Sequence, residues 1–340
     1  MSHKGEALYV KDEFEFIDQI KPASHHQPSL VMGIGDDAAV YTSSQGMREV
    51  VCVDTMIEGV HFTKETLSPY QVGRKALAIN VSDLAAMGAV PRFYLVSIAI
   101  PAVWEDEEVN DLYNGMQEIA DRWKMDLIGG DTVSAKEALV ITVTAIGQVE
   151  EDVSLYRSQA APGDIVFVTG PVGSSAAGLE LLLEKGRHAS FNKSEAELVL
   201  MHQQPEPQVE AGRLCAGTQA RISLNDISDG VASEASELAV ASEVSITLQA
   251  DKIPFHPALD EVVKGQEKKL AFAFNGGEDF QLIGTIEKTA FSSLLENALR
   301  AGIQIHPIGE VKEKAEHPVF IKDKDLIEPL QKGGFNHFKK

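Results

Sequence analysis

The sequence predicts an α/β (α+β) protein of two domains, each with a mixed sheet. Its 340 residues are enough for two domains of ordinary size. Strand-like and helix-like segments alternate, and the series starts again after a polar link at 150–164. We therefore place the domain boundary near residue 152, which gives domains 1–152 and 153–340.

The first half alternates continuous apolar runs, typical of buried strands, with segments of helical spacing. The second helical segment has Val109, Leu112 and Met116 on one face. Strands are predicted at 49–57, 92–100 and 138–149, and helices at 69–87 and 107–123.

The second half repeats this alternation after the polar link. The last predicted element is a strand at 303–311, which we take to close the chain. Strands are predicted at 164–170, 245–250, 280–286 and 303–311, and helices at 173–186, 194–203 and 231–242.

Composition excludes several classes of protein. A net charge of −21 argues against a nucleic-acid partner, because phosphate backbones require Lys and Arg. The first residues contain no apolar signal-peptide core, and the apolar run 93–104 is too short to span a membrane. Cys52 and Cys215 have no paired spacing, so we expect no disulfide framework and a cytoplasmic location.

Asp83 is the most informative acid. It is the only charged residue in ALAINVSDLAAMGAVP, so a solvated side is difficult to place. A buried carboxylate costs several kcal/mol unless it is paired or bound to a cation. Either a structural partner such as Arg74 or a metal ion would satisfy it.

Other acids follow glycines or apolar runs, and each has a simple structural alternative. Asp36 and Asp37 in GIGDDAAV fit a solvated loop, Asp54 a strand end, and Asp131 in LIGGDTV a hairpin turn. In NDISDG, Asp229 fits a helix cap, since Asp is a favoured capping residue. Glu278 and Asp279 in NGGEDF fit a turn. Taken together, the acids favour several Mg²⁺ ions around a polyphosphate, since Mg²⁺ binds carboxylates together with phosphates.

Several familiar motifs are absent. GPVGSSAAG follows a predicted strand and opens a helix, but it lacks the GK[ST] ending of a phosphate loop. We interpret it as a tight strand-to-helix connection. The sequence has no dinucleotide fingerprint, no protein-kinase signature and no HExxH, and neither cysteine has the setting of a nucleophile.

The motifs together resemble a known family. GIGDDAAV, VDTMIEGVHF, KALAINVSDLAAMGAVP, LIGGDTV, YRSQAAPGD, NDISDG and NGGEDF occur in the order found in the thiamine-monophosphate kinase family. This family belongs to a wider superfamily with aminoimidazole ribonucleotide synthetase and selenophosphate synthetase. The resemblance implies a two-domain PurM-like fold. The N-terminal mixed-sheet domain would form a barrel in a homodimer, and the C-terminal domain would be α/β.

The resemblance also implies an activity. Such an enzyme uses ATP as co-substrate to convert thiamine monophosphate to thiamine diphosphate, with several Mg²⁺ ions. We expect direct in-line transfer without a protein nucleophile, and neither a membrane nor a nucleic acid as partner.

The site residues that the resemblance implies fall into four groups. Asp131, Arg157 and Asp229 would act in catalysis. The nucleotide would contact Tyr113, Gly130, Asp131, Arg157 and Ser228. Thiamine monophosphate would contact His61, Glu278 and Phe335. The metal ligands would be Asp36, Asp37, Asp54, Asp83, Asp131, Asp226 and Asp229.

One motif departs from the family pattern. Cys52 and Val53 replace a Ser-Thr pair that often precedes Asp54 in the family, so the number of metal ions stays open. Three rival functions remain: aminoimidazole ribonucleotide synthesis, a metal- or thiamine-phosphate-binding protein without catalysis, and an acidic scaffold. Selenophosphate synthesis is disfavoured, because no cysteine precedes Cys52.

Overall fold

The chain forms two compact units. The computed structural model describes residues 19–34, 38–153 and 155–334. The first unit comprises Met1–Val81 and Pro91–Gln148, and the second comprises Ser82–Val90 and Val149–Lys340. Each unit combines a sheet with helices, which confirms the α/β expectation for both halves. The domain limits 1–152 and 153–340 stay a prediction.

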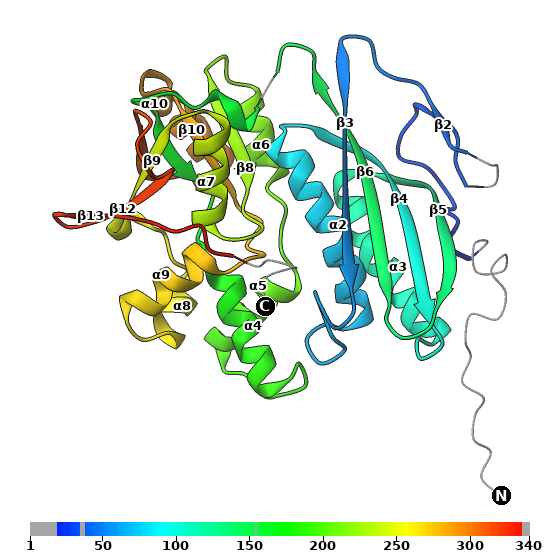
Figure 1. Ribbon diagram of the computed structural model, residues 1–340. Coiled ribbons are helices and arrows are strands. Elements are labelled where there is room, and N and C mark those ends of the chain that lie inside the picture. Colours follow the sequence, from blue (N-terminus) through cyan, green and yellow to red (C-terminus); the bar gives the residue numbers. More distant parts are fainter. Residues whose placement is uncertain (1–18, 35–37, 154, 335–340) are drawn as a thin grey trace, which may run out of the picture. The chain divides into compact units, whose positions relative to one another are not determined.

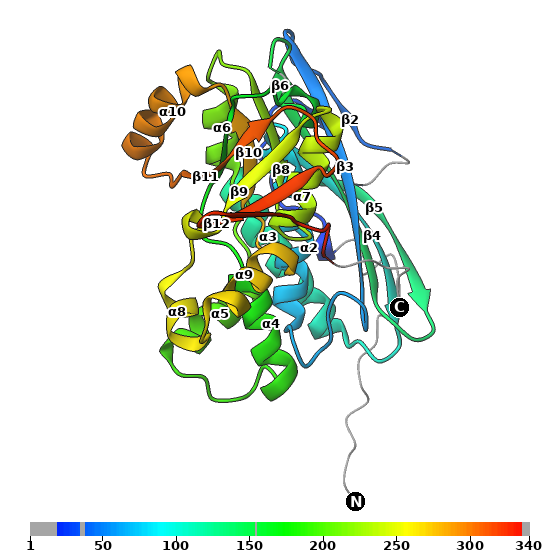
Figure 2. The same cartoon turned by 60° about the vertical axis from the view of Figure 1, so that its left-hand side comes forward.

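The first unit is built on a four-stranded sheet in the order β3-β6-β4-β5. Helices α2 and α3 cover one face of it, as Figures 1 and 2 both show. β4 and β5 are parallel. The bounds are β3 Met47–Ile57, β4 Val90–Pro101, β5 Asp126–Ala135, β6 Val140–Glu150, α2 Pro69–Ala86 and α3 Asp106–Trp123. The predicted strands and helices of this half are confirmed to within a few residues, and β5 is additional.

Two glycines let α2 and α3 approach closely. A Cβ at Gly73 would lie 1.7 Å from the carbonyl oxygen of Leu112. A Cβ at Gly115 would lie 1.9 Å from the carbonyl oxygen of Tyr70. Each helix therefore packs its backbone directly against the other, which only glycine permits.

The sheet's second face is only partly covered. Met56, Val96 and Ile141 are buried on the helix side. On the other side, the short antiparallel pair β1 (Leu30–Met32) and β2 (Val40–Tyr41) covers one end, where the rings of Tyr41 and Phe93 lie 4.8 Å apart.

The remainder of that second face carries exposed valines. Val51, Val53 and Val133 are 61%, 59% and 49% exposed. We call these three valines, with Thr55 and Thr142 between them, the open face. The two threonine hydroxyls are 2.8 Å apart.

The second unit contains a seven-stranded sheet in the order β13-β12-β9-β11-β7-β10-β8. Apart from the parallel pair β12–β9, its neighbouring strands are antiparallel. The expectation that 303–311 closes the chain is wrong, because β12 and β13 follow it and extend one edge. The bounds are β7 Ile165–Val168, β8 Ile222–Asp226, β9 Ser245–Gln249, β10 Leu282–Ile286, β11 His306–Lys312, β12 Val319–Asp323 and β13 Leu326–Pro329.

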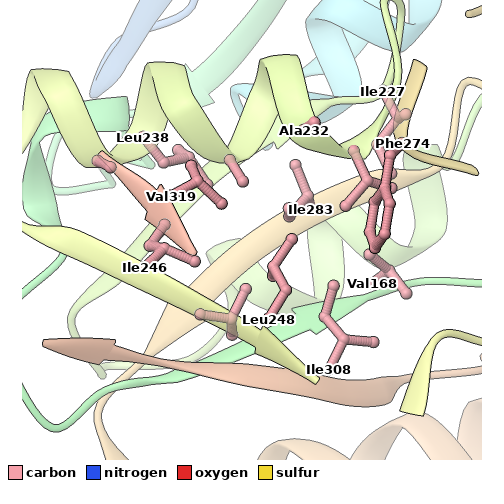
Figure 3. Close-up of a cluster of buried hydrophobic side chains, with 14 of the residues drawn as sticks. Val168, Ile227, Ala232, Leu238, Ile246, Leu248, Phe274, Ile283, Ile308 and Val319 are labelled. Atoms are coloured by element: carbon pink, nitrogen blue, oxygen red, sulfur yellow. The ribbon is translucent and has the colours of Figure 1, made fainter. Parts of the chain in front are cut away.

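Helix α7 packs across this sheet. Its small residue Ala232 and its Leu238 face strand residues such as Ile246 and Ile283 (Figure 3). The residues of α7 and of the sheet that meet in this cluster are buried. The sheet therefore holds α7 in place and fixes the position of its N-terminus. The helices are α4 Ser174–Lys185, α5 Lys193–Gln203, α6 Val209–Ala216, α7 Val231–Ala241, α8 Pro257–Val262, α9 Gln266–Asn275 and α10 Lys288–Ala301, with 3₁₀ turns η1 Arg157–Gln159 and η2 Ala250–Lys252.

Within the described part of the chain, no helix is long and apolar enough to cross a membrane.

Candidate functional site

The turn between β8 and α7 carries three predicted site residues. Asp226 is the last residue of β8, is 4% exposed, and accepts a hydrogen bond of 2.9 Å from Ser82 Oγ. Ser228 and Asp229 follow before Gly230, which is the N-cap of α7 with φ of 96°. The helix-cap alternative for Asp229 is therefore wrong, because the cap is a glycine and no side chain caps this helix.

Glu234, in the first turn of α7, holds this turn together. Its carboxylate accepts hydrogen bonds from Asn225 Nδ2 at 2.6 Å, from Asp229 N at 3.1 Å and from Ser228 Oγ at 3.4 Å. Burial, followed by the nearby charges of Asp226 and Asp229, raises the pKa of Glu234 to about 8. Sequence reasoning missed Glu234. Its signal was an acid among small apolar residues just after a glycine.

Arg157 lies beside the same turn. Its Nε donates to Asn225 Oδ1 at 2.9 Å and its Nη1 donates to Glu237 Oε2 at 2.6 Å. Lys332 binds the other oxygen of Glu237 at 2.9 Å. The Lys332 ammonium, together with Arg157, keeps the pKa of Glu237 below its usual value. The structure thus brings Arg157 together with Asp226, Ser228 and Asp229 through the buried amide of Asn225.

The loop 275–281 lies against this turn. Glu278 N donates to Ser228 O at 2.7 Å, and Phe280 N donates to Ile227 O at 3.0 Å. A Cβ at Gly277 would lie 2.5 Å from Ser228 O, so the two backbones are in direct contact. Glu278 itself has φ of 66°, and its Oε2 lies 3.5 Å from Nδ1 of the buried His202. The loop is therefore more than a solvated turn.

The segment GPVGSSAAG, which resembles a phosphate loop, binds the side chain of Asp279. The segment runs from β7 directly into α4, which confirms the predicted strand-to-helix connection. The carboxylate of Asp279 accepts hydrogen bonds from Gly173 N at 2.5 Å and Ser175 N at 3.0 Å, and a further one from Ser174 N. Burial raises the pKa of Asp279 to about 7. The helix N-terminus, a favourable place for an anion, is thus occupied by the chain's own carboxylate.

In the first unit, Asp54 and Asp131 lie on opposite faces of the sheet. Asp54 is partly buried and shares its side of β3 with Cys52, whose thiol donates to Asn80 O at 3.3 Å. Asp131 is exposed and pairs in register with Ser97 of β4. The hairpin alternative for Asp131 is wrong, because it lies inside strand β5. Val53 is 59% exposed on the open face.

Gly130 has a structural reason to be glycine. A Cβ there would lie 1.9 Å from the carbonyl oxygen of Val96 in the neighbouring strand. The absence of a side chain at Gly130 therefore lets β5 pass close to the backbone of β4.

Three further candidates also have protein contacts. His61 Nδ1 accepts from Ile57 N at 3.0 Å, so a neutral ring carries its proton on Nε2. Burial raises the pKa of Tyr113 on α3. Asp83 lies near the end of α2, in the part of that helix that belongs to the second unit. Arg74, named above as a possible structural partner, pairs with Glu118 of α3 at 3.3 Å.

Asp36, Asp37 and Phe335 lie outside the described residues. Among the residues that are described, no three His, Cys, Asp or Glu side chains gather closely enough to hold a metal ion. The described acids instead divide between the two units, with Asp54 and Asp131 in the first and Asp83, Asp226 and Asp229 in the second.

Comparison with known families assigns both halves of the chain. Residues 35–149 match the AIR synthase related protein, N-terminal domain, and residues 161–322 match the AIR synthase related protein, C-terminal domain.

Named relatives cover nearly the whole chain. A thiamine-monophosphate kinase of Bacillus subtilis is 46% identical over 96% of this chain and 100% of its own length. One of Escherichia coli K12 is 32% identical over 90% of this chain and 92% of its own.

Solved structures agree. A thiamine-monophosphate kinase from Stenotrophomonas maltophilia superposes with a TM-score of 0.83 at 31% identity, covering 93% of this chain and 98% of that one. The structure "AaThiL complexed with AMPPCP and TMP" has a TM-score of 0.75 at 30% identity, covering 96% and 97%. Escherichia coli HypE shares the fold, with a TM-score of 0.75 at 19% identity, covering 95% and 97%.

Proposed function

The chain belongs to the thiamine-monophosphate kinase family, and from this we propose that it transfers the γ-phosphoryl group of ATP to thiamine monophosphate, giving thiamine diphosphate and ADP. The observation that carries the assignment is the 46% identity over 96% of the chain. A relative of the same fold binds an ATP analogue and thiamine monophosphate together, which supports both substrates. The PurM-like two-domain fold with mixed sheets follows from the same comparisons.

The acceptor needs little chemical activation. A phosphate monoester has a second pKa of about 6, so near neutral pH its oxygens are already largely deprotonated. An oxygen of thiamine monophosphate can then attack the γ-phosphorus directly while the bond to the β-phosphate oxygen breaks. The protein's task is to align two anionic reactants and to stabilise the charge of the transition state. This accounts for a site built from acids, amides and an arginine, in which the mechanism requires neither a protein nucleophile nor a general base.

Mg²⁺ fits the residues that the second unit places at the β8–α7 turn. Asp226 and Asp229 provide hard carboxylate oxygens of the kind that Mg²⁺ prefers. Bound Mg²⁺ ions would screen the repulsion between the phosphates of the two substrates. We propose Asp54, Asp83, Asp131, Asp226 and Asp229 as their ligands, with Asp36 and Asp37.

The remaining roles follow from the contacts around the turn. Arg157 is already oriented by Asn225 and Glu237, so its planar guanidinium is suited to a phosphate group of the nucleotide. Ser228, Gly130 and Tyr113 complete the nucleotide contacts that we propose. Glu278, His61 and Phe335 are proposed to contact thiamine monophosphate, where an aromatic ring can pack on a flat heterocycle.

We also propose that the protein is a homodimer in the cytoplasm. The open face presents three exposed valines on a sheet, and such a surface is normally covered. Asp131 lies on the same side, so pairing there would place this acid at the interface. The cytoplasmic location is supported by the two cysteines, neither of which forms a disulfide.

One assay tests the reaction. The purified protein is incubated with ATP and Mg²⁺, and the products are separated by chromatography, with thiamine monophosphate, thiamine and aminoimidazole ribonucleotide precursors as parallel acceptors. We expect thiamine diphosphate and ADP in equal amounts from the monophosphate alone. Turnover only with another acceptor would reject the substrate assignment and retain the fold.

A further inference from the structure

Asp279 is a partly buried carboxylate that the proposed reaction does not use. Its two oxygens are taken up by the backbone N–H groups of Gly173, Ser174 and Ser175, the first residues of α4 and its N-cap. These N–H groups have no partner inside the helix, and the helix dipole adds a partial positive charge at the same point. Asp279 therefore joins loop 275–281 to α4 over a sequence separation of 106 residues.

The backbone on both sides of Asp279 is strained. Glu278 has φ of 66° and Phe280 has φ of 48°, a region that residues with a side chain rarely adopt. Such conformations persist only where surrounding contacts enforce them. Two left-handed residues around one anchored carboxylate indicate that the Asp279 anchor enforces the conformation of its neighbours.

The strained segment also lies against the β8–α7 turn. Glu278 N binds Ser228 O at 2.7 Å, and Phe280 N binds Ile227 O at 3.0 Å. On the other side, the Glu278 carboxylate lies 3.5 Å from His202 Nδ1, which is 3.1 Å from Ser175 Oγ in the first turn of α4. The direction of the Glu278 side chain is thus set from α4 as well as from the loop.

We propose that Asp279 is a positioning residue, which by occupying the N-terminus of α4 holds loop 275–281 in the strained conformation that presents Glu278 to thiamine monophosphate. This inference rests on the proposed function and adds to it a residue that does not touch substrate. The proposal also gives GPVGSSAAG a role: its backbone N–H groups bind the Asp279 carboxylate in place of a phosphate.

The experiment compares Asp279→Ala with wild type at pH 8, with and without formate, using chloride at equal ionic strength as the salt control. We expect the KM for thiamine monophosphate to rise about tenfold, because misplacing a positioning group by about 1 Å has effects of this order or larger. The KM for ATP should change less, because Glu234 and Asn225 hold the β8–α7 turn independently. Formate, a small carboxylate, should fill the vacated N-terminus and lower the raised KM.

The matched control is Asn192→Ala, which removes the side-chain cap of α5 at a distance from this turn in the sequence. A merely structural loss of a cap predicts the same result for both variants: a lower melting temperature, unchanged KM and no effect of formate. Asp279→Asn is the second variant. It fills the same space but turns a donor toward an N–H group, so its KM should rise without rescue by formate.

A readout without turnover separates this proposal from the reaction itself. Amide hydrogen exchange at 173–175 should accelerate in Asp279→Ala and slow again with formate. Unchanged KM values, or formate effects equal in Asp279→Ala and Asn192→Ala, would overturn the positioning role. If Asp279→Ala fails to fold, an unchanged KM in Asp279→Asn overturns it instead. If the wild type shows no turnover, the proposed function is rejected. The hydrogen-exchange result at 173–175 then decides by itself whether Asp279 holds the N-terminus of α4.

Discussion

At the scale of single residues, Asn225 connects two parts of the site. Its carbonyl oxygen accepts from Arg157 and its amide donates to Glu234, and the side chain is 2% exposed. An arginine can only donate, so the amide must turn its oxygen toward Arg157 and its N–H toward Glu234.

Asn225→Asp should therefore be harmful although it changes few atoms. It places a carboxylate oxygen against Glu234, and leaving a buried polar group without its partner costs about 1–3 kcal/mol. We expect a lower free energy of unfolding in urea and a lower kcat, because Arg157 and the β8–α7 turn lose their common partner. Asn192→Asp is the matched control, since Asp caps helices as well as Asn does. Equal behaviour of the two variants would contradict the bridging role.

Asp279 should make stability depend on pH. Burial raises its pKa to about 7 in the folded protein, against about 3.9 in an unfolded chain. Between these values the folded protein holds a proton that the unfolded chain has released. The free energy of unfolding should thus fall as pH rises from about 4 to 7, by up to about 1.4 kcal/mol per pH unit.

Asp279→Asn lacks this titration, so it isolates the effect. Urea unfolding at several pH values should show wild type losing stability relative to Asp279→Asn as the pH rises through this range. The contribution of the carboxyl is fully present below the lower pKa and lost above the higher one. A difference that stays constant with pH would mean that the three N–H groups hold Asp279 ionised throughout.

Asp83→Asn tests the metal proposal at the only charged residue of ALAINVSDLAAMGAVP. The amide keeps the size of the side chain but removes the charge that a hard cation prefers. We expect a large loss of turnover and a higher Mg²⁺ concentration for half-maximal rate, read from Mg²⁺ titrations of activity and of nucleotide binding by calorimetry. Near-normal values in both titrations would exclude Asp83 as a ligand.

The residues that could be predicted are those whose signal lies in a short stretch of sequence. Asp226 and Asp229 occur together in one turn, and the structure brings Ser228 and Arg157 beside them. Asp279 was seen only as part of a turn, because its partners lie more than 100 residues away. Glu234 was passed over because helical periodicity does not reveal that a carboxylate faces inward.

At the scale of helices and strands, strong local periodicity was sufficient in the first unit. Strands β12 and β13 were missed because residues 319–329 form an apolar block, a charged block and a short apolar pair rather than a regular alternation, and β13 is exposed along its length. The amphipathic helix α10 was missed although Leu294 and Ala298 recur on one side. Pairing with neighbouring strands, rather than local preference, forms β12 and β13.

The contact between α2 and α3 gives a prediction at this scale. Gly115→Ala would place a Cβ 1.9 Å from the carbonyl oxygen of Tyr70, so the helices must separate. Overpacking of this kind costs about 1–3 kcal/mol, and we expect at least that loss in urea unfolding. Gly302→Ala is not a suitable control, because Gly302 has φ of 72°. Gly217→Ala is suitable, since its Cβ would have ordinary contacts only. Similar stabilities for the two variants would show that α2 and α3 adjust without cost.

At the scale of the whole molecule, the open face would be exposed in a monomer and covered in the proposed homodimer. Val51 and Val53 of β3 and Val133 of β5 are each about half exposed or more. Covering apolar area contributes about 25 cal/mol per Å², so these side chains favour association with a second sheet. The chain has a net charge of −21, which opposes association, so the apolar face must outweigh charge repulsion.

Val53→Lys should therefore convert a dimer to a monomer. Light scattering coupled to size exclusion should give about twice the chain mass of 36.8 kDa for wild type and the single mass for the variant. Leu299→Lys is the matched control, because Leu299 is 80% exposed on α10 in the second unit, and it should stay dimeric. Since Asp131 lies on the side of the open face, loss of the dimer should also weaken Mg²⁺-dependent nucleotide binding. A wild type that is monomeric at every concentration would refute the dimer, and a dimeric Val53→Lys would move the interface to another surface.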